Sequence, residues 1–136
     1  MKRLALPGVF ALVLTGCQLP PERGEALRPL PDDVRPLPYA ELLTRARFQV
    51  EAATDAYVLD KWETIEDSAK ALEQTARYMA KAMEVPEKHK GSLAVTSGDL
   101  AKLASDLREA AREKDDTKIK EAMTKVISKV RELKID

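Results

Sequence analysis

The apolar residues between Asp60 and Met83 recur at alternating steps of three and four, and this spacing constrains the fold more than any other feature of the chain. A stripe of this kind stays on one side of an α-helix for about six turns, which is the pattern of a helix that packs into a bundle. Most of the remaining positions in the segment are charged. The stripe consists of Trp62, Ile65, Ala69, Leu72, Ala76, Met79 and Met83.

Three further stripes with the same spacing predict helices at about 39–59, 92–114 and 117–134, in addition to the helix at 60–84. Four amphipathic helices with short connections predict an all-α fold, most simply an antiparallel up-and-down four-helix bundle over residues 39–136. The three stripes are Leu43, Ala46, Val50, Ala53 and Tyr57; Leu93, Ser97, Leu100, Ala104, Leu107 and Ala111; and Ile119, Met123, Val126, Val130 and Leu133.

The connections between these helices contain local signals. Asp60 followed by Glu63 has the spacing of a capping box, which predicts that a new helix begins there; one long helix that runs through this point is the alternative. Pro86 disfavours helix at the residue before it, and Asp115 is placed to cap the last helix. Gly98 lies inside the third helix, where it predicts the close approach of another helix.

The N-terminal sixteen residues have the order of a secretory signal peptide. Two basic residues precede an apolar run that is too short to span a bilayer, and small residues follow. The segment Leu14-Thr15-Gly16-Cys17 resembles the bacterial lipobox. That resemblance implies cleavage before Cys17 and lipidation of Cys17, and Gln18 in place of aspartate implies sorting to the outer membrane. An ordinary signal peptide with a chance cysteine is the alternative.

Residues 17–38 form a proline-rich linker behind the proposed lipidation site. Prolines fix φ and remove hydrogen-bond donors, so we expect an extended tether that reaches about 60 Å over twenty residues. A proline ligand for a partner's groove is the alternative interpretation. The prolines between Leu19 and Pro38 are Pro20, Pro21, Pro29, Pro31, Pro36 and Pro38.

Composition excludes several classes of function. The chain contains 23 basic and 23 acidic residues, interspersed along the helices, so nothing predicts a nucleic-acid partner. Cys17 is the single cysteine, which excludes an internal disulfide and any cysteine-pair metal or haem attachment site.

The third and fourth predicted helices contain the segment 107–111 (LREAA), the acidic turn Asp115-Asp116, and Ile119, Met123 and Val126. In these features about the last fifty residues resemble cytochrome c-prime and related four-helix cytochromes. In that family the last helix leads to a CxxCH motif that binds haem covalently, whereas the corresponding segment here, 130–134, reads VRELK. The b-type relatives bind haem through a methionine of the first helix and a histidine of the last, and both are missing here.

Candidate chemistry is limited to one soft-ligand set. Met79 and Met83 stand one helical turn apart, and together with His89, the single histidine, they could bind monovalent copper. The alternative is that both methionines fill the core, while Lys88 and Lys90 repel a cation from His89. No serine has a glycine-rich elbow around it, and no Glu-x-x-His motif occurs, so we expect no enzymatic activity.

The sequence therefore predicts an envelope lipoprotein whose cofactor-free bundle acts as a binding or structural module. Its partners would be the membrane, through the lipid anchor, and an envelope protein, with pairing to a second copy left open. The alternative is a degenerate cytochrome c-prime-like protein that retains non-covalent haem, metal or a small ligand in the bundle.

Overall fold

The computed structural model describes residues 23–31 and 35–133, and this part of the chain is helical, with one isolated bridge and no strand. The all-α prediction is confirmed. The helices are α1 (Arg23–Ala26), α2 (Tyr39–Val58), α3 (Trp62–Met79), α4 (Glu87–Lys90), α5 (Leu93–Glu113) and α6 (Asp116–Glu132).

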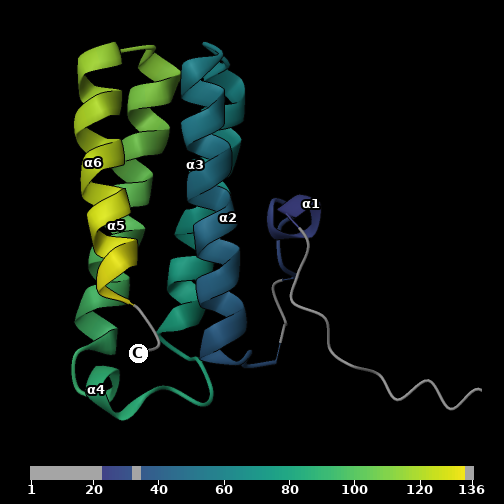
Figure 1. The fold of residues 1–136 in the computed structure, drawn as a ribbon, viewed down its shortest axis with the longest axis vertical. Coiled ribbons are helices and arrows are strands. Elements are labelled where there is room, and N and C mark those ends of the chain that lie inside the picture. The colour runs from purple at the N-terminus through teal and green to yellow at the C-terminus, as the bar shows by residue number, and fades with distance from the viewer. Residues whose placement is uncertain (1–22, 32–34, 134–136) are drawn as a thin grey trace, which may run out of the picture.

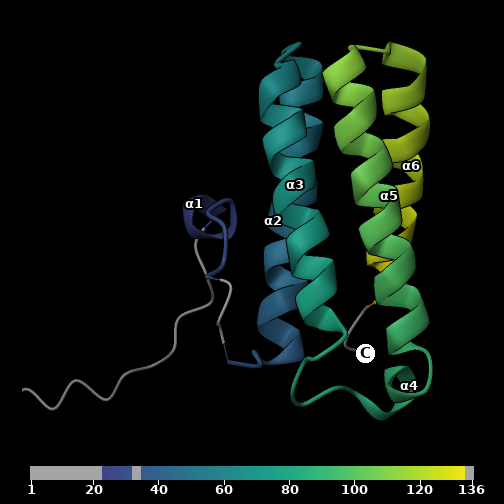
Figure 2. The same cartoon turned by 180° about the vertical axis from the view of Figure 1, so that it is seen from behind.

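The four long helices lie side by side, and the short α1 lies outside them next to α2 and α3 (Figures 1 and 2). The turn from α2 to α3 and the turn from α5 to α6 are at the same end of the molecule, at the top in Figure 1, and α4 is at the other end. α3 makes its largest contacts with α5 and α2, and α5 packs on α6. The seam between α2 and α6 is the least extensive of these four.

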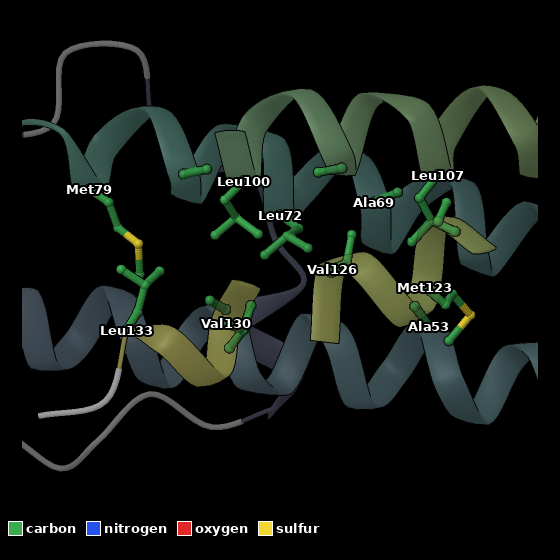
Figure 3. Packing of buried hydrophobic residues seen from close by; sticks show 14 of the residues in the cluster. Ala53, Ala69, Leu72, Met79, Leu100, Leu107, Met123, Val126, Val130 and Leu133 are labelled. Atoms are coloured by element: carbon green, nitrogen blue, oxygen red, sulfur yellow. The ribbon is translucent and has the colours of Figure 1, made fainter. Parts of the chain in front are cut away.

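Most residues of the predicted stripes are buried in the core. Figure 3 shows Leu72, Leu100, Val126 and Val130 converging between the helices. Many of the inward residues are alanines, which allow close helix approach, and the void among the core residues is only about 10 Å³, roughly the size of one water. Burial of these side chains is the main source of stability.

The turn between α2 and α3 differs from the predicted capping box. α3 begins at Trp62, and the side chain of its N-cap residue, Lys61, makes no capping hydrogen bond. Asp60 instead adopts the left-handed region at φ 54°, and the amides of Lys61 and Asp60 donate to the carbonyls of Ala56 and Tyr57 at 2.9 and 3.2 Å. This pattern is the Schellman motif that ends α2. The break between the helices is therefore present, but the cap belongs to the helix before it.

The second long helix is also shorter than predicted. α3 ends at Met79, and the chain continues to Pro86 without helix. Backbone pairing with the entry to α2 replaces the last helical turn: the Met83 amide donates to the Leu37 carbonyl at 2.9 Å, and the Tyr39 amide donates to the Met83 carbonyl at 2.8 Å. Met83 is consequently 47% exposed, and its assignment to the core stripe was wrong.

Two further local predictions have opposite outcomes. The Asp115 side chain accepts a hydrogen bond from the Lys118 amide at 3.1 Å, so the predicted N-cap of the last helix is confirmed. Gly98 is exposed, and a Cβ built on it would meet no atom of the described residues within 4 Å. The predicted close approach at Gly98 is therefore wrong.

Candidate functional site

Residues 23–31, here called the strap, lie against α2 and α3 instead of extending away from them. The strap begins with the single helical turn of α1, and Ala26 at the end of that turn has no exposed surface. Leu30 is half-buried and packs against the edge of the core. The prediction of an extended tether is wrong for these nine residues, although proline still limits the helix to one turn.

Side chains of α2 bind the first half of the strap through its carbonyl oxygens. The Arg45 guanidinium donates to the carbonyls of Glu25 and Arg28, each at 3.2 Å. Gln49 Nε2 donates to the Ala26 carbonyl at 2.7 Å. Arg45 and Gln49 are four residues apart and therefore share one face of α2.

Side chains of α3 bind the second half in the same manner. The Gln74 amide pairs with both backbone groups of Leu30: Oε1 accepts from the Leu30 N–H, and Nε2 donates to the Leu30 carbonyl, both at 2.8 Å. The Tyr78 hydroxyl donates to the Pro31 carbonyl at 2.7 Å. Gln74 and Tyr78 are again four residues apart, so the two helices present matched polar pairs to the strap.

Thr75 completes this polar surface and joins its two halves. Gln49 Nε2 also donates to Thr75 Oγ1, at 2.9 Å, and both residues are about 1% exposed. We call the four side chains that bind the strap, together with Thr75, the cradle. They are Arg45, Gln49, Gln74, Thr75 and Tyr78.

The cradle contains polar groups that folding leaves incompletely satisfied. Arg45 Nε and Gln49 Oε1 have no hydrogen-bond partner within the described ranges. Burial lowers the pKa of the Arg45 guanidinium, although the negative charges of Glu41 and Glu25 act in the opposite direction and raise it. A buried polar group without a partner costs about 1–3 kcal/mol, so these two atoms reduce the net gain from the hydrogen bonds that Arg45 and Gln49 make to the strap.

A cavity of about 410 Å³ lies between the strap, α3 and α5. Its walls include Leu27 and Pro29 of the strap and the carboxylate of Glu73, which is 7% exposed. Arg77 donates to Glu73 Oε1 at 2.7 Å, and Arg108 lies 3.1 Å from Oε2 as an ion pair without hydrogen-bond alignment. Glu73 therefore pairs with both arginines, and its ion pair with Arg108 links α3 to α5.

The groove between α5 and α6 is also lined by charged side chains that form ion pairs. It has a volume of about 360 Å³, and Lys118 and Lys125 in its wall lie 3.0 and 3.1 Å from Glu113 and Glu121. Within residues 23–31 and 35–133, no three His, Cys, Asp or Glu side chains are grouped so that they could hold a metal ion.

The residues proposed for copper are placed in different environments. Met79 is fully buried, and its side chain points toward Leu133 in Figure 3. Met83 lies beyond the end of α3, so the helical spacing that suggested a shared site is absent. His89 belongs to α4, and its ring stacks on Tyr39 with centroids 5.7 Å apart. Cys17, the predicted lipidation site, lies outside the described residues.

Comparison with known family models, curated proteins and solved structures found no match. In the part of the chain that the structure describes, no helix is long and apolar enough to cross a membrane.

The cradle was missed by sequence reasoning, although a signal was present. Arg45 and Gln49 lie among the apolar residues of α2, and Thr75 lies between Gln74 and the stripe residue Ala76. Polar side chains on an inward helix face need buried partners. That requirement could have indicated that another segment covers this side of the bundle, but not which segment.

Proposed function

We propose that this protein is a lipid-anchored lipoprotein of the bacterial envelope, acylated at Cys17 and facing the periplasm, with the outer membrane favoured. Its domain is an antiparallel up-and-down four-helix bundle that acts as a binding or structural module. The observation that supports this role best is the strap. Residues 23–31, which follow the proposed anchor, are fixed along the bundle by buried and half-buried polar side chains of α2 and α3.

The up-and-down topology is supported by the positions of the turns. Consecutive long helices are joined at alternate ends of the molecule, and each also packs on the next in sequence (Figures 1 and 2). α6 then contacts α2, which brings the last helix next to the first long one. Short connections of this kind favour antiparallel neighbours.

The strap changes how far the domain can stand from the membrane. As a free linker, the twenty residues before the bundle would reach about 60 Å. With residues 23–31 held in the cradle, only the six residues 17–22 remain as a tether, with a reach of about 20 Å. The bundle would therefore act close to the lipid surface instead of at the end of a long arm.

The cofactor-free assignment is supported by the packed interior. Binding pockets for small molecules have volumes of several hundred cubic ångströms, whereas the void among the core residues is about 10 Å³. The first long helix offers no methionine and the last no histidine to ligate haem. We therefore favour a module that binds an envelope protein, or a second copy, through helix faces over a degenerate cytochrome c-prime, and we propose no catalytic role.

The anchor is tested by Cys17→Ser. The variant should move from the membrane fraction to the soluble fraction, and mass spectrometry of the wild-type N-terminus should show acyl groups on Cys17. Retention of the variant in the membrane would contradict the lipoprotein proposal. The cytochrome alternative is tested separately: a Soret band in protein expressed with haem available would contradict the cofactor-free assignment.

A further inference from the structure

The turn between α2 and α3 exposes two adjacent aliphatic side chains. Val58 is 75% exposed and Leu59 is 62% exposed. Trp62, the single tryptophan of the chain, is half-buried at the start of α3 directly after this turn. We call Val58, Leu59, Lys61 and Trp62 the tip.

The tip is fixed in place. The Schellman hydrogen bonds from Lys61 and Asp60 close the turn, and Tyr57, one residue before Val58, donates its hydroxyl to Asp116 at 2.6 Å. That bond ties the end of α2 to the start of α6. These hydrogen bonds fix the backbone of the turn, and Val58 and Leu59 remain exposed to solvent in the folded protein.

The strap leads the chain toward this end of the molecule. Pro31 is bound by Tyr78, one residue before the end of α3, and Ala26 by Gln49 in the middle of α2. Arg23 then forms an ion pair with Asp55, three residues before Val58. Read toward the N-terminus, the strap therefore runs along the bundle from the α4 end toward the tip.

The six residues before Arg23 are few enough to keep the proposed anchor near the tip. Cys17 lies six residues before Arg23 and so within about 20 Å of it. Val58 is only about 5 Å along α2 from Asp55, whereas Tyr39 at the opposite end is about 24 Å away. The tip is therefore the end of the bundle nearer to the point where the anchored chain meets α2.

We propose that the tip docks on the phospholipid surface that holds the anchor, with Val58 and Leu59 inserted at the boundary between headgroups and acyl chains. This inference rests on the proposed lipidation of Cys17. Asp60 and Lys61 at the turn balance in charge, so burial of apolar surface, and not attraction to anionic lipid, drives the contact. Two aliphatic side chains bind a membrane weakly alone, but the anchor makes their contact intramolecular and so raises its occupancy.

Trp62 reports on this contact directly. The native protein, purified from membranes and reconstituted into phosphatidylcholine vesicles, is compared in plain vesicles and in vesicles with brominated acyl chains, which quench nearby tryptophan. We expect Trp62 emission to shift to shorter wavelength on reconstitution and to fall about twofold with brominated lipid, because the interface lies within reach of the indole. The double variant Val58→Asp/Leu59→Asp should lose both effects.

Val95→Asp is the matched control. Val95 is 69% exposed near the start of α5, at the end of the molecule opposite to the tip, so its substitution should leave the quenching unchanged. Circular dichroism checks that each variant is folded. A second measurement, bromine quenching at several salt concentrations with wild-type protein, should show no salt dependence.

The outcomes separate this inference from the proposal on which it rests. Protein that carries acyl groups and floats with the vesicles, but whose Trp62 is not quenched, would refute tip docking and leave the lipoprotein assignment intact. Equal loss of quenching in the Val95 control would also refute it. Protein without acyl groups that does not float would contradict the proposed function itself.

Discussion

Gln74→Ala should release the strap while leaving the helices in place. The Gln74 side chain makes two hydrogen bonds, one to the amide and one to the carbonyl of Leu30, both at 2.8 Å. Each contributes about 1 kcal/mol net, so strap binding should weaken by about 2 kcal/mol. Alanine is the better helix former by a few tenths of a kcal/mol, so α3 itself should not lose stability.

Hydrogen exchange at the Leu30 amide measures this effect where it occurs. A loss of about 2 kcal/mol corresponds to an approximately 30-fold faster exchange of that amide. Core amides such as those of Leu72 and Leu107 should keep their exchange rates, because they open with the helices and not with the strap. The global midpoint of denaturation should likewise change little.

Two variants sharpen the interpretation. Gln74→Glu keeps an acceptor for the Leu30 amide but loses the donor to the Leu30 carbonyl, so it should give an intermediate exchange rate. Glu121→Ala removes an exposed ion pair with Lys125 on the far side of the bundle and should leave Leu30 unaffected. Unchanged protection of Leu30 in Gln74→Ala would refute the cradle, as would an equal loss of protection at Leu72.

Three further predictions test the fold. Lys114 ends α5 in the left-handed region at φ 56°, so Lys114→Gly should raise the free energy of unfolding by about 1 kcal/mol, as measured by urea denaturation. Burial raises the pKa of Tyr39 to about 12, and its hydroxyl donates to the Leu133 carbonyl at 2.6 Å. The folded state therefore holds the Tyr39 proton more tightly than the unfolded state does, and its contribution is complete below pH 10 and lost as the pH rises toward 12. The loss should amount to about 2–3 kcal/mol, and Tyr39→Phe should remove that step from an alkaline denaturation series. Leu72 is 1% exposed at the centre of Figure 3, so Leu72→Ala should lower the free energy of unfolding by about 2–5 kcal/mol in a thermal melt.

The helices could be predicted because the same stripes that pattern the sequence are buried in the structure. Ile65, Ala69, Leu72 and Met79 are at most 1% exposed, as their spacing requires. The stripes did not predict where the helices end, because other interactions determine the helix ends. At Asp60 a left-handed turn replaced the capping box, and at Met83 backbone pairing with Leu37 and Tyr39 replaced a helical turn. The pairing at Met83 depends on residues far away in the sequence, which the local pattern does not contain.

The strap could not be predicted, because its contacts join residues far apart in sequence through groups that every residue possesses. Gln74 and Leu30 are separated by 44 positions, and Tyr78 and Pro31 by 47. Prolines at 29 and 31 correctly indicated a non-helical backbone, but an extended backbone can either remain in solvent or lie on a surface. Only the polar side chains on the opposing helices distinguish the two.

Recognition through the backbone also explains why the strap carries no side-chain motif. Arg45, Gln49 and Tyr78 bind carbonyl oxygens, which any sequence supplies, so most strap side chains are free of this constraint. Arg23, Ala26 and Leu30 are exceptions, because Arg23 pairs with Asp55, Ala26 has no exposed surface, and Leu30 packs against the edge of the core. The information that positions the strap is therefore stored in the cradle on α2 and α3, and a search for a linear motif in the N-terminal segment would not find it.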